Sequence, residues 1–305
     1  MANYHFKVSP AAENMRLDVF LAAELTDAPS RTYVKKLIDH GHVKVNEAPV
    51  KAHHLISGGD DIAVNIPAEF LTPAYIAPED IPLNIVFQDS ALLAIDKPAG
   101  MLVHPARGRY TGTLVNALLF HAKQLSDFSG DLMRPGIVHR LDQETSGLIL
   151  IAKDNITHTK LAKQFKKRTV SKRYVALVEG EVEFDEGLIE APIGQHPKYR
   201  DKKAVRFDED ARASETVYRV IRRCHGKTLV SLSPKTGRTH QLRVHMKYLG
   251  HPILGDDKYG KRTSFPRLAL HARAIAFNHP RDKRRIEIST PIPAAFLAAV
   301  AVGKT

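Results

Sequence analysis

The sequence predicts an α+β protein with two domains, and three observations support this prediction. The chain has 305 residues, which is more than one compact hydrophobic core usually organises. Helical periodicity dominates the first part, whereas short apolar runs of strand length dominate the rest. The connections between these runs are too short for a regular series of parallel βαβ units, so we expect a mixed, largely antiparallel sheet.

The composition is that of a globular protein with a basic surface. Hydrophobic residues make up 43% of the chain and charged residues 26%, which excludes a disordered tail. Forty-five Lys and Arg residues against 33 Asp and Glu residues leave a formal charge of +12. A chain with such an excess most often binds a polyanion, so we expect nucleic acid as the partner.

Two features that the sequence lacks, paired cysteines and long apolar segments, indicate the cellular compartment. Cys224 is the single cysteine, so an internal disulfide and a CxxC zinc or redox site are excluded. The N-terminus has no basic segment followed by an apolar run, and no stretch approaches the ~18 apolar residues of a membrane span. We therefore expect a protein of the reducing cytoplasm that has no membrane segment.

Two amphipathic helices are expected in the first domain, which we assign to residues 1–66. Apolar residues fall on one face of each helix, and the second helix ends at Gly41, a residue suited to a left-handed helix end. These apolar residues are Leu17, Phe20, Leu21 and Leu25 in the first helix and Val34, Leu37 and Ile38 in the second. Residues 43–50 should then form a strand and a turn.

The second helix carries Arg31, Lys35 and Lys36 on its polar face. Taken alone, such a face is most often merely solvated. The order of helix, basic helix, glycine and strand, with Gly59 and Asp60 further on, resembles the S4 RNA-binding domain over residues 15–66. This resemblance implies that the three basic side chains contact structured RNA.

Residues 67–82 are predicted to be a linker, and residues 83–305 to be the second domain. Prolines at positions 67, 73, 78 and 82 interrupt any regular element in the linker, which should therefore be extended and semi-rigid. Strands of the second domain are expected at residues 85–89, 92–96, 147–153, 173–180, 214–221 and 228–234. An Ala-rich run at residues 296–302 predicts a last helix.

A basic helix is expected at residues 157–168. The run 160–173 contains seven basic residues and no acidic one. Solubility alone would explain a charged face, but a run of a single sign favours phosphate binding. The side chains expected on that face are Lys163, Lys166, Lys167 and Arg168. Residues 281–285, RDKRR, are a weaker case, because a hairpin turn would explain them equally well.

The segment 135–154 is the most informative for chemistry. Residues 147–152 predict a strand buried on both faces, so residues 139–146 should form a loop on a rigid support. Arg140 and Asp142 lie in that loop. A carboxylate there could be a nucleophile, a general base, a metal ligand or one half of a salt bridge, and spacing alone favours the salt bridge.

The sequence does not support a two-carboxylate, metal or nucleotide-binding site. Glu144 is the only acidic residue near Asp142, and the pairs His53/His54 and His240/His245 lack a third partner at ligand spacing. Neither a GxxxxGK[ST] motif nor a GxGxxG motif after a strand is present. We therefore assign no metal and no nucleotide cofactor.

The sequence HRLD at 139–142, followed by TSG at 145–147, resembles the signature of the RluA family of pseudouridine synthases. Further blocks match that family in the expected order, at residues 95–105, 172–180, 234–256 and 267–272. The resemblance covers nearly all of residues 83–293. It implies the pseudouridine synthase fold for the second domain and the isomerisation of uridine in RNA.

The resemblance also implies roles for particular residues. Asp142 takes the position of the catalytic aspartate, Tyr174 that of the tyrosine under the target base, and Arg243 that of the basic residue paired with the aspartate. Arg140 matches the arginine that inserts where the flipped nucleotide leaves. The same matching places His139, Arg238 and Leu270 among the residues at the RNA site.

The chemistry of uridine isomerisation is consistent with this set of residues. Isomerisation breaks the bond between ribose C1′ and uracil N1 and rejoins the ring through C5, so the nucleotide must first leave its stack. A carboxylate can trap C1′ covalently or stabilise an oxocarbenium-like state, and the sequence leaves both roles open for Asp142. Because the reaction is redox-neutral and transfers no external group, we expect no cofactor and no metal.

Within the family, the segments 79–89, 101–108, 112–119 and 134–142 most resemble the RluD branch. That resemblance implies 23S ribosomal RNA in the large-subunit precursor as the substrate, with target uridines in the helix 69 loop, and we expect a monomer. An RluC-like enzyme for other large-subunit sites, or a transfer RNA synthase, is the alternative. From another class, the alternative is a non-catalytic RNA-binding assembly factor.

Overall fold

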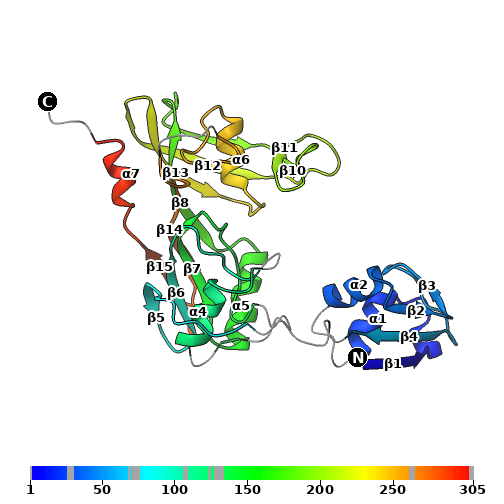
Figure 1. Ribbon diagram of the computed structural model, residues 1–305. Helices are drawn as coiled ribbons and strands as arrows, with labels where there is room; N and C mark the ends of the chain where they lie inside the picture. The colour runs from blue at the N-terminus through cyan, green and yellow to red at the C-terminus, as the bar shows by residue number, and fades with distance from the viewer. Residues whose placement is uncertain are drawn as a thin grey trace. The chain divides into compact units, whose positions relative to one another are not determined.

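The computed structural model describes residues 2–25, 31–67, 70, 76–105, 109–122, 125–126, 134–260 and 265–301. The chain divides into two compact units (Figure 1). The first comprises residues 1–77 and 127–135, and the second comprises residues 78–126 and 136–305. The division between Ala77 and Pro78 falls inside the predicted linker of 67–82, of which residues 68–69 and 71–75 lie outside the described residues.

In its described residues, the first unit is a four-stranded antiparallel sheet packed with α-helices. Its strands follow the order β1-β4-β2-β3. They are β1 (Ala2–Lys7), β2 (Val43–Val45), β3 (Ala48–Pro49) and β4 (Asp61–Ile66). A 3₁₀ turn η1 (Pro10–Ala12) precedes α1 (Leu17–Glu24) and α2 (Arg31–Asp39).

The apolar faces predicted for both helices form the core of this unit. All seven apolar residues named for them in the sequence are buried in one cluster with the inner faces of β2 and β4. Gly41 follows α2 with φ +77°, the left-handed conformation that glycine adopts without steric cost. The predicted helices, strand and turn are confirmed.

The second unit is built on one long mixed sheet. Within the described residues the strand order is β5-β6-β7-β14-β8-β13-β12-β9, and β15 also pairs with β14. Every pairing is antiparallel except that of β7 with β14. The predicted α+β class with a largely antiparallel sheet is confirmed. The strands are β5 (Ile85–Gln88), β6 (Leu92–Lys97), β7 (Ser146–Ala152), β8 (Ser171–Glu179), β9 (Glu186–Glu190), β12 (Glu215–Cys224), β13 (Lys227–Pro234), β14 (Leu270–Asn278) and β15 (Arg285–Ser289).

Helices cover both faces of one end of this sheet. Leu148 and Leu150 of β7 pack with Leu161 of α5 (Asn155–Lys166), whereas Ile149 and Ile151 pack on the opposite face with α4 (Leu114–His121). This alternation explains why β7 is buried along its whole length, as predicted. The predicted basic helix corresponds to α5.

The parallel contact between β7 and β14 supports the end of the loop 139–145. Gly147 pairs with Ala272 across it and has φ +112°. A Cβ at position 147 would clash with the backbone of Ala272. Only glycine therefore allows the two strands to approach this closely at the point where the loop enters β7.

At the other end of the sheet, α6 (Gln241–Tyr248) and α7 (Ala294–Ala298) pack with β8 and β13 in a separate core. A two-stranded ribbon, β10 (Ile193–Gln195) with β11 (Lys203–Val205), lies beside α6 (Figure 1). The sequence patterns did not predict α6, β9, the ribbon, β14 or β15. The predicted last helix is shorter than expected, and Val302 lies outside the described residues.

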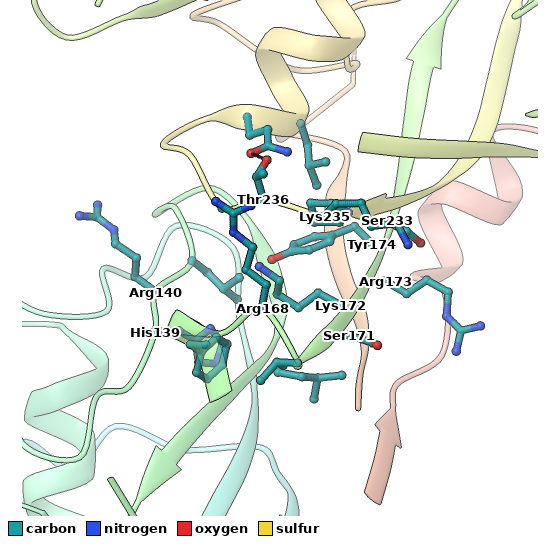
Figure 2. A pocket seen from close by; sticks show the side chains of 18 of the residues that line it. His139, Arg140, Arg168, Ser171, Lys172, Arg173, Tyr174, Ser233, Lys235 and Thr236 are labelled. Carbon is teal, nitrogen blue, oxygen red and sulfur yellow. Dashed lines mark hydrogen bonds between the residues drawn. The ribbon is translucent and has the colours of Figure 1, made fainter. Parts of the chain in front are cut away.

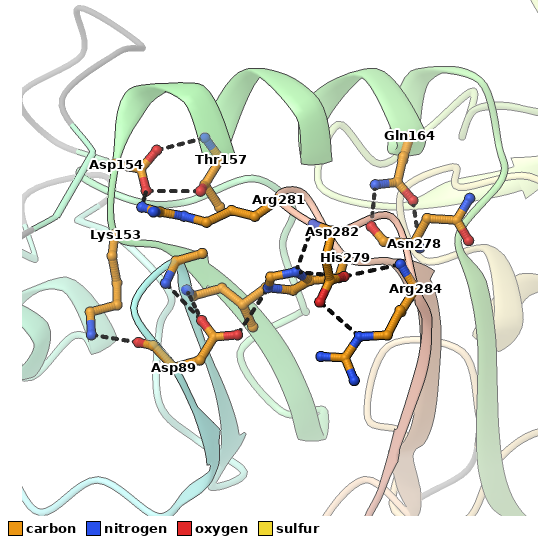
Figure 3. A network of polar contacts seen from close by, with 12 residues as sticks. Asp89, Lys153, Asp154, Thr157, Gln164, Asn278, His279, Arg281, Asp282 and Arg284 are labelled. Atoms are coloured by element: carbon orange, nitrogen blue, oxygen red, sulfur yellow. Dashed lines mark hydrogen bonds and ion pairs between the residues drawn. The ribbon is translucent and has the colours of Figure 1, made fainter.

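The basic segment 281–285 forms the β14–β15 hairpin turn and the first residue of β15 (Figure 3). His279, just after β14, contacts Asp89 through Nε2 at 2.9 Å and Asp282 through Nδ1 at 3.1 Å. Arg281 donates to Asp154, the N-cap residue of α5. The turn therefore has a structural function in fastening the hairpin to α5 and to the start of β6.

Within the described part of the chain, no helix is long and apolar enough to cross a membrane.

Candidate active site

A pocket of about 870 Å³ opens where the loop 139–145, β8, the end of α5 and the start of α6 meet. Most of the site residues predicted in the second domain line it. They are His139, Arg140, Asp142, Lys166, Arg168, Tyr174, Arg238, Arg243 and Leu270. Lys163, on α5, and Lys167, which caps the end of α5, are exposed and do not line the pocket. The three basic residues of α2 belong to the first unit.

Asp142 lies in the loop before β7, with its side chain 21% exposed. The Nη1 atom of Arg243 is 3.8 Å from its Oδ2, and the Nε2 atom of His240 is 3.9 Å from the same oxygen. Both partners come from the segment that begins α6. The expected pairing of Arg243 with Asp142 is therefore present as a long ion pair, in a position that keeps the carboxylate accessible from the pocket.

The shorter bonds of Arg243 go to a residue that sequence reasoning missed. Its Nε and Nη2 atoms donate to the two oxygens of Asp256 at 2.7 and 2.6 Å, and Asp256 is fully buried. Burial opposes the charge of Arg243, yet the bonds to Asp256 raise its pKa further. Asp256 thus fixes the planar guanidinium, which leaves Nη1 free to face Asp142.

A hydrogen-bond chain assigns the tautomer of His240. The backbone N–H of Lys203 donates to the Tyr259 hydroxyl at 2.8 Å, and that hydroxyl lies 2.6 Å from Nδ1 of His240. Among the described residues, Nδ1 of His240 is the one acceptor within hydrogen-bond distance of that hydroxyl, so we assign the hydroxyl proton to this bond. Burial lowers the pKa of His240, against the effect of Asp142. The neutral ring therefore carries its proton on Nε2, the atom that faces Asp142.

Tyr174 stands on β8, where it pairs with Leu232 on one side and Ala272 on the other. Its ring packs against two apolar clusters while lining the pocket. Burial, with the nearby Asp142 carboxylate, raises the pKa of Tyr174 well above its usual range. The phenol is thus protonated and offers a rigid aromatic face with a donor at its end.

Lys97 is a buried residue that stabilises the loop 139–145 by hydrogen bonding. It is fully buried at the end of β6, and its Nζ donates to the carbonyls of Pro98, Met101 and Gln143 at 2.8, 2.9 and 3.0 Å. Burial lowers its pKa to about 8, although the Glu144 and Asp142 carboxylates favour the charged form. The bond to Gln143 holds the residue that directly follows Asp142.

Cations surround the pocket. Figure 2 shows the side chains of Arg168, Lys172 and Tyr174 directed into it, while Arg140 extends from the loop away from Lys172 and Tyr174. Burial lowers the pKa of Lys172. Burial, with the charges of Arg168 and Arg212, lowers the pKa of Arg238. These cations repel one another in the free protein. A bound polyanion would neutralise them, so the cluster favours binding of a polyanion.

His139 and Leu270 lie in the wall of the pocket. The His139 ring stacks on Phe165 at 4.5 Å, and its Nε2 accepts a bond from the Leu150 N–H at 2.9 Å. Burial, with the charge of Lys172, lowers the pKa of His139 to about 3, so this ring is neutral. Leu270 is buried at the start of β14. Both residues act through packing in this structure.

The basic residues predicted on α2 differ in their surroundings. Lys35 and Lys36 are exposed on the helix. Arg31 is instead bonded to the buried Asp18 through Nε and Nη2 at 3.0 to 3.1 Å, and Arg16 holds the same carboxylate from another side. Arg31 therefore has a structural function in joining α1 and α2.

No metal site is indicated by the described residues, among which no group of three or more His, Cys, Asp or Glu side chains could hold an ion.

Comparison with known proteins decides the family. The model of the RNA pseudouridylate synthase family matches residues 91–248, and the S4 domain model matches residues 15–62. The chain belongs to the RNA pseudouridine synthase family. As a member of that family it is an enzyme, an isomerase that converts uridine in RNA to pseudouridine, and it carries an S4 RNA-binding domain.

Relatives of this family match over most of the chain. An uncharacterized RNA pseudouridine synthase of Bacillus subtilis is 42% identical over 93% of this chain and 93% of its own length. Ribosomal large subunit pseudouridine synthase D of Nitrosomonas europaea is 40% identical over 94% of this chain and 84% of its own. Among solved structures, human RNA pseudouridylate synthase domain containing 1 is 28% identical with a TM-score of 0.59, covering 70% of this chain and 84% of its own.

Proposed function

We propose that this pseudouridine synthase acts on uridines of 23S ribosomal RNA, with Asp142 as the carboxylate at the reacting sugar. One observation carries the proposal: Asp142, Tyr174 and Arg243 come from three separate segments and line one pocket with a cationic rim. Relatives about 40% identical that are named ribosomal large subunit pseudouridine synthase D support the choice of ribosomal RNA.

The reaction needs a nucleotide turned out of its stack. Unstacking costs a few kcal/mol, which a ring stacked on Tyr174 and the insertion of Arg140 into the vacated space would offset. Arg140 is exposed on the loop two residues before Asp142, a suitable position for such an insertion. Phosphates beside the everted nucleotide would then face Lys166, Arg168 and Arg238 on the rim.

The atoms balance within the substrate. The C1′–N1 bond breaks, the uracil turns, a C1′–C5 bond forms, and the C5 proton leaves while N1 gains one. Asp142 either forms an ester with C1′ or stabilises the positive charge that develops there. Arg243 and Nε2 of His240 both face Oδ2 of this carboxylate and orient it. Tyr174 remains protonated, so it serves as a relay that passes on one proton as it accepts another.

The proposed target is the helix 69 loop within a large-subunit precursor, modified by a monomer without a cofactor. An unpaired loop lowers the cost of everting a base. Such a substrate would place the enzyme in the cytoplasm, where ribosomal subunits are assembled. Other large-subunit sites or a transfer RNA are the alternatives at the level of substrate.

The direct test is tritium release. Wild-type protein and the Asp142→Asn variant would be incubated with a 23S ribosomal RNA transcript that contains C5-tritiated uridine. We expect release by the wild type and none by the variant, while both bind the transcript equally. Release by the variant at the wild-type rate would overturn the role of Asp142. Binding without release by the wild type would instead indicate an assembly factor.

The substrate is tested by mapping. Pseudouridines would be located across ribosomal and transfer RNA from a strain that lacks this protein and from its parent. We expect pseudouridine to be lost in the helix 69 loop and restored by the wild-type gene. Loss at other large-subunit positions, or only in transfer RNA, would overturn the helix 69 assignment and leave the chemistry standing.

A further inference from the structure

The β10–β11 ribbon ends in a loop, residues 196–202, that belongs to none of the elements lining the pocket. We call it the tip loop. We propose that the tip loop is a second RNA-binding surface, on which Tyr199 stacks with an unpaired base beside the nucleotide in the pocket. This inference rests on the proposed function and extends the substrate contacts beyond the pocket.

The loop is held in one conformation although it is exposed. The amide nitrogen of Gln195 donates to the carbonyls of Tyr199, Arg200 and Lys202 at 3.1, 2.8 and 2.8 Å. Nδ1 of His196 accepts bonds from the N–H groups of Lys198 and Tyr199 at 3.1 and 3.3 Å. These bonds order the loop before any partner binds, which lowers the entropic cost of binding.

The ordered loop presents an aromatic ring to solvent. Tyr199 is 53% exposed, and its ring lies 4.9 Å from the His196 ring, with the Lys202 amine 5.1 Å from its centroid. Stacking on aromatic rings is the usual way in which proteins hold unpaired bases, and adjacent cations strengthen it.

The charge of the loop identifies the partner as a polyanion. Lys198, Arg200 and Lys202 are basic, and the one acidic residue, Asp201, is paired with Lys258 at 2.9 Å. Within the described residues, Lys198 and Arg200 are exposed and form no ion pair. Two unpaired cations flanking an exposed ring match a base between two phosphates.

The base of the ribbon leads directly to the candidate active site. Lys203 donates its N–H to the Tyr259 hydroxyl at 2.8 Å. The Tyr259 ring packs 5.0 Å from the Arg243 guanidinium, which in turn faces Asp142. Val205 of β11 packs with Val244 of α6. A strand of RNA with one nucleotide in the pocket would therefore pass near the tip loop.

The test compares Tyr199→Ala, Tyr199→Phe and, as a matched control, Phe184→Ala. Phe184 is another solvent-exposed aromatic, 65% exposed, in the loop before β9. Binding of a 23S ribosomal RNA transcript would be measured by filter retention, and tritium release would give kcat and KM. We expect Tyr199→Ala to weaken binding and raise KM roughly 10-fold, the order of one lost base stack, with kcat unchanged. Tyr199→Phe and Phe184→Ala should match the wild type.

A second variant tests the phosphate contacts independently. Lys198→Ala combined with Arg200→Ala should lower the slope of log affinity against log salt concentration by about 1.4, for two contacts to a single strand. Equal affinity, KM and salt slope in the wild type, Tyr199→Ala and the double variant would overturn the inference. Failure of the wild type to release tritium would refute the proposed function instead, and the binding assay would still report on the tip loop.

Discussion

Nη1 of Arg243 lies 3.8 Å from Oδ2 of Asp142, while the other nitrogens of the same guanidinium hold Asp256 at 2.6 and 2.7 Å. The stronger pair is thus the one farther from the pocket. Asp256 is fully buried, so it cannot contact RNA. Its effect on the reaction must pass through the orientation of Arg243, which makes Asp256 a positioning residue.

We therefore expect Asp256→Asn to lower kcat by roughly 10- to 100-fold, by analogy with the loss when a group that orients a metal ligand is removed. RNA affinity should stay within about twofold of wild type, because the rim is unchanged. Tritium release and filter binding would measure the two quantities. Asp185→Asn is the matched control, because Asp185 pairs with Arg223 at an exposed site. Unchanged kcat in Asp256→Asn would contradict the positioning role.

Lys97 offers a test of loop support. Lys97→Met keeps the apolar stem and removes three hydrogen bonds, so the carbonyls of Pro98, Met101 and Gln143 lose their shared donor. We expect a loss of about 2 to 4 kcal/mol in the free energy of unfolding, at about 1 kcal/mol or more for each bond. Kcat should fall as well, since Gln143 is next to Asp142.

Lys153→Met is the control for that substitution. Lys153 donates to a single backbone carbonyl, that of Asp89, at 2.7 Å. Denaturant unfolding should show a loss of about 1 kcal/mol, and tritium release should be unaffected. Equal effects of the two substitutions on kcat would show that Lys97 has no special connection to the loop.

Much of this fold follows from local sequence patterns. The run from Gly147 to Ala152 is apolar throughout because α4 and α5 cover both faces of β7, and this pattern identified the strand and the loop that precedes it. The apolar faces of α1, α2 and α5 were equally clear from the helical spacing of their apolar residues. The loop pattern pointed to Asp142 as a candidate, but its catalytic role, like the roles of Arg243 and Tyr174, was predicted only from the match to family blocks.

The missed elements have a physical explanation. In α6 the polar residues Gln241, Arg243 and His245 are all buried, because each has partners inside the domain. A helix that buries polar side chains loses the hydrophobic periodicity by which helices are recognised. Asp256 lies 13 residues from its partner, so that pairing depends on tertiary structure that no local pattern reports.

His271 predicts a loss of stability in acid. The ring is buried between Ser146, 2.9 Å from Nδ1, and Thr290, 2.9 Å from Nε2. Burial, with the charges of Arg267 and Arg273, lowers its pKa from 6.5 to about 4. Between these values the unfolded chain binds more protons than the folded one. The contribution of His271 to stability is therefore complete above pH 6.5 and is lost as the pH falls towards 4.

The expected slope from this residue is up to about 1.4 kcal/mol per pH unit. It would be measured as the difference between wild type and His271→Gln in urea unfolding at several pH values from 7 to 4. The variant should be less stable at pH 7 and approach the wild type in acid. His53→Gln, at an exposed position, should run parallel to the wild type. A His271→Gln curve that also runs parallel would refute the prediction.

The last prediction distinguishes the functions of Arg31 and Lys35, two basic residues of α2 that the sequence assigned together to RNA binding. Burial opposes the charge of Asp18, but its bonds to Arg16 and Arg31 lower its pKa. Arg31→Gln removes one of these partners, so we expect the first unit to lose about 1 to 3 kcal/mol of stability. Lys35→Gln, on the exposed face, should leave stability unchanged and reduce the salt slope of RNA binding by about 0.7 to 0.9. Thermal unfolding and filter binding at several salt concentrations would show the contrast. If Arg31→Gln unfolds at the wild-type temperature and lowers the salt slope as Lys35→Gln does, then Arg31 binds RNA and its bond to Asp18 is incidental.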